Sequence, residues 1–134
     1  MRHDHRVSIE AKLTPAELAY IRVFPPHTWR PGAPQLRDYA IRDARDAVAP
    51  GRAPTPAARC LADELARYVA AAWRFEAHMA ELSADAPAIK RALHRALRLS
   101  DGKPIGWRRI FDICLAVDLH DAEMTARSCI RTMR

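Results

Sequence analysis

The chain has 134 residues, of which 49% are hydrophobic, and its 22 basic and 16 acidic side chains leave a net charge of +6. This length is typical of one domain, and the hydrophobic content excludes a wholly disordered chain. Only 4 glycines argue against a Gly-rich phosphate loop and a turn-dense all-β fold, and they favour helices. We therefore expect a mainly α fold: a helical bundle of five to six helices with one short N-terminal β-strand or extended arm.

The first predicted element is a strand over residues 6–13, where apolar side chains alternate with polar ones from Val7 to Leu13. Alternation with a period of two is typical of a strand with one buried face. A helix is the competing interpretation, because Ile9 and Leu13 also fit a helical stripe. Pro15 disfavours helical geometry at the residue before it, so we prefer a strand, either paired or packed as an arm on the bundle.

Two helices are expected next. Thr14 as N-cap, Pro15 in the first turn and Glu17 in a capping box predict a helix from residue 14 to about 24. Residues 25–34 contain four prolines and are expected to be irregular. A second helix is predicted over about 35–48, with Arg and Asp at the i,i+4 spacings typical of a solvated face.

Residues 6–48, a short alternating strand followed by two helices, resemble the ribbon-helix-helix family of DNA-binding proteins. The sequence RVSIEAKL at 6–13 and TPAEL at 14–18 carry the resemblance. It implies a homodimer whose paired strands enter the major groove and whose outward side chains read base edges. Here those outward positions are Arg6, Ser8, Glu10 and Lys12. The long proline-rich connection at 25–34 and the acidic Glu10 depart from the family's pattern.

Residues 49–56 form a Pro-rich linker. The linker divides a strand-helix-helix unit at 1–48 from a helical unit at 57–134, unless both belong to one compact domain. Thr55 and Pro56 are interpreted as the start of a long helix that ends near residue 83 and carries an apolar heptad seam. We expect the seam to pack within one bundle or against a second copy or partner. Its residues are Leu61, Leu65, Tyr68, Ala72, Phe75, Met79 and Leu82.

Positive charge is concentrated in residues 87–109, which hold seven basic side chains and one acidic one. A basic amphipathic helix is predicted to open at 85–87 and to end near 99, before a turn at 100–103. Such a patch is typical of a surface that binds a polyanion. A solvated face and a site for an acidic protein or membrane surface are the alternatives. The candidate DNA-binding residues are Lys90, Arg91, His94, Arg95, Arg98, Lys103, Arg108 and Arg109.

Two further helices are expected, from 104 to about 117 and from about 119 to 133. We interpret Trp107 as a core residue, with stacking on an exposed base as the alternative. The acidic residues from Asp118 to Glu123 are expected to cap the last helix, because carboxylates favour a helix N-terminus. The side chains expected to face inward in that helix are Leu119, Ala122, Ala126, Cys129 and Met133.

No local motif for catalysis or metal binding is present in the sequence. The three cysteines lack C-x-x-C spacing, and no P-loop, H-E-x-x-H or G-x-S-x-G pattern occurs. His3 and His5 form an H-x-H pair at the terminus, where we expect disorder rather than a metal site. We therefore expect no enzyme, no metal and no cofactor. The sequence also lacks a signal peptide and a membrane-spanning run, so we expect a cytoplasmic protein.

The sequence thus predicts a non-enzymatic DNA-binding or nucleoprotein-associated protein, either a transcription regulator or an accessory factor. It would act through its basic surface and self-associate as a homodimer, and RNA is the alternative nucleic acid. The alternative function is a helical protein–protein interaction module, an inhibitor or adaptor, that binds an acidic partner protein.

Overall fold

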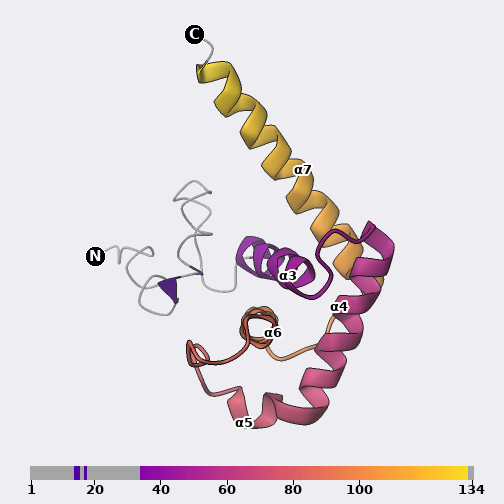
Figure 1. Ribbon diagram of the computed structural model, residues 1–134, viewed down its shortest axis with the longest axis vertical. Coiled ribbons are helices and arrows are strands. Elements are labelled where there is room, and N and C mark those ends of the chain that lie inside the picture. Colours follow the sequence, from indigo (N-terminus) through magenta and orange to yellow (C-terminus); the bar gives the residue numbers. More distant parts are fainter. Residues whose placement is uncertain (1–13, 16, 18–33, 133–134) are drawn as a thin grey trace, which may run out of the picture.

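The computed structural model describes Thr14, Pro15, Glu17 and residues 34–132. The predicted strand at 6–13 and most of the predicted helix at 14–24 lie outside this part. The described part is mainly helical, as predicted, and shows no strand. Its elements, drawn in Figure 1, are α3 (Pro34–Val48), α4 (Pro54–Tyr68), a π-helical turn (Val69–Trp73), α5 (Arg74–Glu76), α6 (Ala88–Leu99) and α7 (Trp107–Thr132).

Prolines set the beginnings of the first two of these helices. Helices α3 and α4 begin at Pro34 and Pro54, where the fixed φ of proline suits a first helical turn. The prediction of a helix over 35–48 is confirmed. The prediction that Thr55 caps the next helix is wrong, because α4 already includes Thr55 and its N-cap is Ala53, without a side-chain hydrogen bond.

The predicted helix from 57 to 83 ends early, which corrects its C-terminal boundary. After Tyr68 the chain passes through the π-helical turn and the short α5, and the helix ends at Glu76. The wider turn places Trp73 beside α6, where its ring centroid lies 5.4 Å from that of His94. His94 Nε2 lies 3.0 Å from the carbonyl oxygen of Glu76, so α6 supplies a partner for the last turn.

Helix α6 lies below α3 and beside α4 in Figure 1, and it packs mainly on α3. Its apolar residues pack in one core with those of α3, α4 and the first half of α7. Leu61, Leu65 and Tyr68 of the heptad seam belong to this core. This part of the seam therefore packs within the chain, which was one of the two predicted alternatives. Leu82 is also buried, Met79 is half-buried, and Phe75 is 62% exposed.

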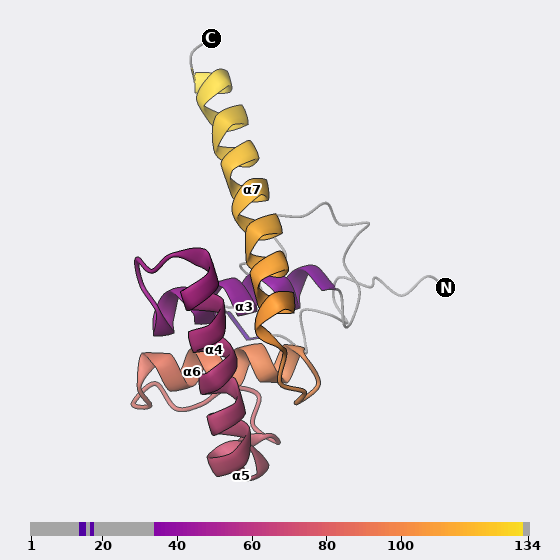
Figure 2. The ribbon, with the colours of Figure 1, turned by 90° about the vertical axis from the view of Figure 1, so that its right-hand side faces the viewer.

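Helix α7 is continuous from Trp107 to Thr132, which contradicts the prediction of two helices joined at 118. Its first half packs on α3 and α4 through buried residues that end at Val117. Its second half extends beyond the body, as Figures 1 and 2 show. The prediction that Leu119, Ala122 and Ala126 face inward is therefore wrong: all three are exposed, Leu119 by 63%.

The predicted turn at 100–103 is confirmed. The amides of Ser100 and Gly102 both donate to the carbonyl of Leu97, which ends α6, and Asp101 and Gly102 have φ of 56° and 75°. The turn also lies close to Trp73. A Cβ built on Gly102 would lie 2.8 Å from Trp73 Nε1. Glycine therefore serves here both for its conformation and for the space it leaves.

Candidate nucleic-acid interface

Of the predicted DNA-binding residues, Arg6, Ser8 and Lys12 lie outside the part of the chain that the structure describes. The other eight fall into two groups. Lys103, Arg108 and Arg109 are exposed before and within the first turn of α7. The other five lie on α6, and we call them the α6 basic face: Lys90, Arg91, His94, Arg95 and Arg98. None of these five is fully exposed, because α6 packs against α3 and α4.

Several residues of the α6 basic face already have partners within the chain. His94 is 2% exposed and contacts Glu76 and Trp73. Lys90 Nζ lies 3.1 Å from Glu76 Oε1. Arg91 Nε donates to the carbonyl of Ala86 at 3.1 Å. The α6 basic face therefore offers less accessible positive charge than the sequence suggests.

Arg98 contacts the N-terminal segment of the same chain. Its Nη1 donates to both carboxylate oxygens of Glu17, a residue with no exposed surface. The Glu17 amide donates to Thr14 Oγ1 at 3.3 Å, which confirms Thr14 as an N-cap. Burial raises the pKa of the Glu17 carboxyl, while the positive charge of Arg98 opposes that rise.

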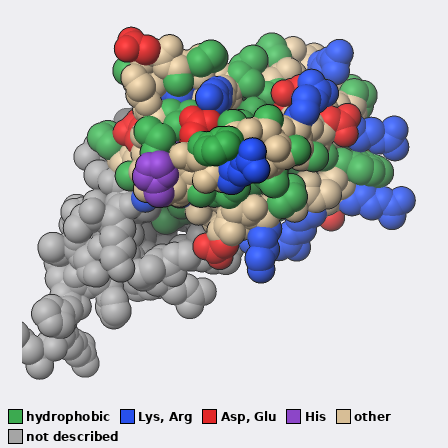
Figure 3. All heavy atoms as spheres, turned by 90° about the horizontal axis from the view of Figure 1, so that it is seen from below, with side chains coloured by type: hydrophobic (Ala, Val, Ile, Leu, Met, Phe, Trp, Pro, Cys, Tyr) green, Lys and Arg blue, Asp and Glu red, His purple; other side chains and the backbone are tan. Residues whose placement is uncertain are grey.

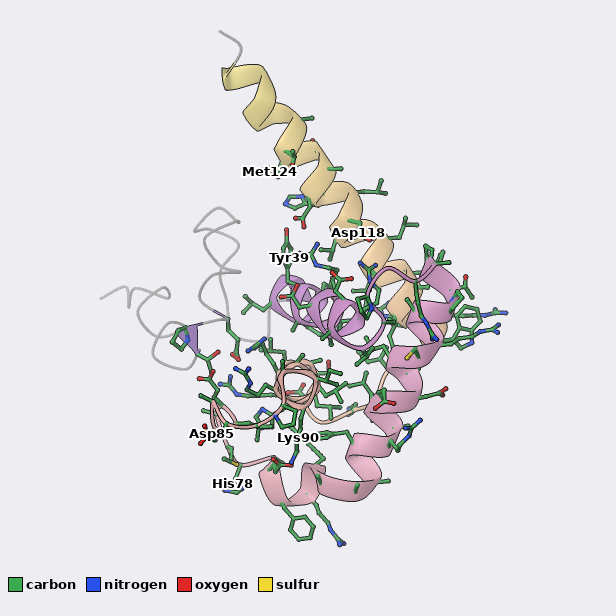
Figure 4. All side chains as sticks on the ribbon, in the orientation of Figure 1. Tyr39, His78, Asp85, Lys90, Asp118 and Met124 are labelled. Atoms are coloured by element: carbon green, nitrogen blue, oxygen red, sulfur yellow. The ribbon has the colours of Figure 1, made fainter. Side chains whose placement is uncertain are left out.

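Helices α3 and α7 are joined by an ionic network that the sequence did not reveal. Arg42 Nη1 lies 2.6 Å from Asp121 Oδ2, and Arg45 Nη1 lies 2.9 Å from Asp118 Oδ2. Tyr39 Oη donates to Asp121 Oδ1 at 2.7 Å. Figure 4 shows Tyr39 and Asp118 where the two helices meet. The predicted capping role of Asp118 and Asp121 is wrong, because both lie in the interior of α7.

The same network changes the ionisation of its members. Burial raises the pKa of the Asp121 carboxyl, but hydrogen bonds from Tyr39 and Arg42 outweigh it and hold that pKa below its ordinary value. Burial and the bond to Asp121 raise the pKa of the Tyr39 hydroxyl. Arg42 also reaches Asp46 of its own helix at 4.0 Å, an i,i+4 contact. These arginines are neutralised within the fold and leave little charge for a partner.

A second set of cations lies on the side of α4 and at the start of α7. The Arg59 guanidinium lies over the Trp107 ring, 4.6 Å from its centroid, and that of Arg108 lies over the same ring at 5.4 Å. Arg109 and Lys103 are exposed nearby in the sequence. We call Arg59, Lys103, Arg108 and Arg109 the α4–α7 basic surface. In Figure 3, Lys and Arg side chains gather along the right-hand edge, which is the side of α4 in Figure 1.

The cations of the α4–α7 basic surface differ from those of α3 in having no carboxylate partner among the described residues. Trp107 is half-buried against the core, and Arg59 and Arg108 lie over its ring. The prediction that Trp107 is a core residue therefore holds in part. Arg59 was not predicted as a binding residue, because it lies outside the basic run at 87–109. The sequence did carry a signal for its exposure, because Arg59 is not one of the apolar residues, such as Leu61 and Leu65, that form the buried face of α4.

The described residues do not form a metal site, since no group of three or more His, Cys, Asp or Glu among them is placed to hold an ion. The pair His3 and His5 lies outside this part. Burial raises the pKa of the Cys114 thiol to about 11, so this side chain stays protonated and unreactive near neutrality. Among the helices described, none combines the length and the apolar character needed to cross a bilayer.

Comparison of the chain with protein-family models, with curated proteins and with solved structures found no match.

Proposed function

We propose that the chain is a non-enzymatic DNA-binding protein that holds the phosphate backbone on the α4–α7 basic surface. The observation that supports this proposal is the pair of exposed arginines, Arg59 and Arg108, that lie over Trp107 without a carboxylate partner among the described residues. Lys103 and Arg109 are exposed nearby in the sequence. Arginine is well suited to this role, because its planar fork matches two oxygens of a phosphate.

Trp107 contributes by restricting the two arginines that lie over its ring. A guanidinium held over an indole face gains a cation–π attraction and samples fewer conformations. Less entropy is then lost when a phosphate binds. The start of α7 adds to the attraction, because the first amides of a helix point outward and carry partial positive charge. Each phosphate contact releases condensed counterions, so binding should weaken steeply with salt.

The expected binding has little sequence preference. The surface combines the side of α4, a loop and the first turn of α7, and its cations suit phosphates rather than a run of base edges. This geometry fits an accessory factor that coats or supports DNA. RNA shares the phosphate chemistry, and competition between an RNA duplex and a DNA duplex of the same length distinguishes the two.

The experiment compares Arg59→Gln/Arg108→Gln with wild type in duplex binding between about 50 and about 200 mM salt. Loss of two phosphate contacts should lower the salt slope by about 2. Arg67→Gln is the matched control, since Arg67 is 73% exposed on α4 and pairs with Glu64 at 3.1 Å. An equal loss in the control, or an unchanged slope in the double variant, contradicts the proposal. Arg109→Gln, which removes a third cation of the surface, should lower the slope by about 1.

Self-association is a further part of the proposal. In a ribbon-helix-helix-like dimer, residues 6–13 of two chains would pair and present Arg6, Ser8 and Lys12 to DNA. Ile9→Pro should then dissociate the dimer, because proline removes a ladder hydrogen bond. Sedimentation of the wild type as a monomer at high concentration would contradict this part while leaving the α4–α7 basic surface untouched.

A second candidate function, a protein–protein interaction module, is favoured by exposed apolar side chains along α7. Leu115, Leu119 and Met124 are 48%, 63% and 39% exposed. Figure 4 places Met124 on the stretch of α7 that extends past α3. Leu115→Ser/Leu119→Ser should abolish binding of an acidic partner protein and leave DNA binding unchanged. If the same variant loses DNA binding, α7 acts with the basic surface and this second function fails.

A further inference from the structure

The contact between Glu17 and Arg98 has the chemistry of an occupied anion site. One guanidinium nitrogen of Arg98 reaches both oxygens of a carboxylate that has no exposed surface. A phosphate presents the same paired oxygens to a guanidinium. The carboxylate belongs to the N-terminal segment of the chain.

Two further arginines of α6 lie close to this site. A cavity of about 10 Å³ beside it is lined on α6 by Arg91, His94 and Arg95, and it has room for about one water. Thr14 and Glu17 also line it, as do residues 80–82, which include Glu81. Loss of the Glu17 carboxylate would make the net charge of these described residues more positive by one.

The attraction between Glu17 and Arg98 contributes only in part to the stability of the fold. A carboxylate that leaves water loses its hydration, and the attraction of a guanidinium returns only part of that loss. The Arg98 side chain keeps 21% of its surface exposed, so it stays within reach of an outside ligand. An external phosphate offers Arg98 the same paired oxygens, and Arg91 and Arg95 lie nearby to contact it as well.

We propose that Arg98, Arg91 and Arg95 form a second phosphate-binding site on α6, and that Glu17 occupies it as a built-in competitor. When the segment with Thr14 and Glu17 leaves α6, a phosphate of the DNA backbone takes the place of the carboxylate. The segment thus limits DNA binding through an autoinhibitory contact. This site is separate from the α4–α7 basic surface, although its expected ligand follows from the proposed function.

The test is Glu17→Gln, which keeps the shape of the side chain and removes its charge. Duplex binding should tighten by roughly tenfold, the worth of one charge-assisted hydrogen bond, and the salt slope should steepen by about 1. The matched control is Asp38→Asn, which also removes one negative charge and frees an arginine, Arg37, at 3.0 Å on α3. An equal gain in Asp38→Asn shows a general charge effect and overturns the proposal.

A second comparison separates this proposal from the first. Arg98→Gln added to Glu17→Gln should abolish the gain, whereas Arg59→Gln/Arg108→Gln should leave the gain in place. If those two arginines prove irrelevant but Glu17→Gln still tightens binding, only the first proposal fails. A gain that survives Arg98→Gln overturns the present one.

A measurement on the wild type avoids any folding defect of the variants. The Glu17 amide is protected by its bond to Thr14, so its hydrogen exchange reports whether the segment is docked. Saturating DNA duplex should speed this exchange at least severalfold. Unchanged or slower exchange at Glu17 means that the segment stays on α6, and it overturns the proposal.

Discussion

Replacing Gly102 by alanine tests whether the turn after α6 is held by both conformation and close packing. A side chain at φ 75° costs about 1–2 kcal/mol in the left-handed region. The new Cβ would also lie 2.8 Å from Nε1 and 3.3 Å from Cε2 of Trp73. The indole lies between Tyr68 and His94, with centroid distances of 6.2 and 5.4 Å, so it cannot move aside freely. Overpacking of this kind costs about 1–3 kcal/mol more.

Gly51→Ala is the matched control for the packing part. Gly51 has nearly the same φ, 72°, but a Cβ there meets nothing within 4 Å. Alanine also restricts the unfolded chain equally in both variants, so that contribution cancels. We expect Gly102→Ala to be less stable than Gly51→Ala by about 1–3 kcal/mol, which lowers the melting temperature by an additional 4–10 °C or so.

Urea unfolding followed by far-UV circular dichroism measures this difference, provided that the slope with denaturant stays the same. Equal destabilisation by the two alanines would refute the packing argument and leave only the conformational cost. Trp73→Phe in the Gly102→Ala background should recover part of the loss, because the smaller ring makes room for the Cβ. A double variant with strictly additive losses would also contradict the reasoning.

Two other predictions concern the core and the ionic network. Leu65→Ala should lower the free energy of unfolding by about 2–5 kcal/mol and Phe75→Ser by less than about 0.5, because Leu65 is 1% and Phe75 62% exposed. Comparable losses in urea unfolding would mean that the whole seam is buried. Asp121→Asn should destabilise the fold at neutral pH and progressively less below about pH 4. The reason is that a carboxyl with a lowered pKa stabilises the fold above its unfolded pKa and loses that effect as pH falls. A pH-independent difference in melting temperature would contradict this prediction.

Local signals in the sequence predicted much of the helical architecture. Helix α3 begins within one residue of its predicted start, α4 begins at Pro54 rather than after Thr55, and Gly102 lies in the predicted turn that ends α6. The amphipathic pattern of residues 88–99 correctly predicted a helix with an apolar face, since Leu93 and Leu97 are buried. These features depend on neighbours in sequence, which is why a single sequence suffices for them.

Long-range contacts explain what the sequence did not predict. The helix after Tyr68 turns and ends because Trp73 and Glu76 meet His94, a residue of another helix. Likewise, no residue near Asp118 in the sequence indicates that its carboxylate accepts a hydrogen bond from Arg45, which lies 73 positions earlier. Local charge patterns cannot show such pairings.

The candidate site was predicted only in part for the same reason. Lys103, Arg108 and Arg109 are exposed as expected, but the face of α6 is shared with other parts of the fold. Whether a basic helix is peripheral or central depends on the packing of the whole chain. Arg59 joins the basic surface only because α4 packs beside the start of α7, which brings its guanidinium over Trp107.

The division of α7 into a packed and a projecting half has a consequence for how this helix forms. Starting an isolated helix is unfavourable, but extending an existing one costs little for each residue added. The half packed on α3 and α4 acts as a preformed nucleus, so the remaining turns to Thr132 need only propagation. Fraying then begins at the Thr132 end and advances towards Asp121, where hydrogen bonds to Tyr39 and Arg42 anchor the helix.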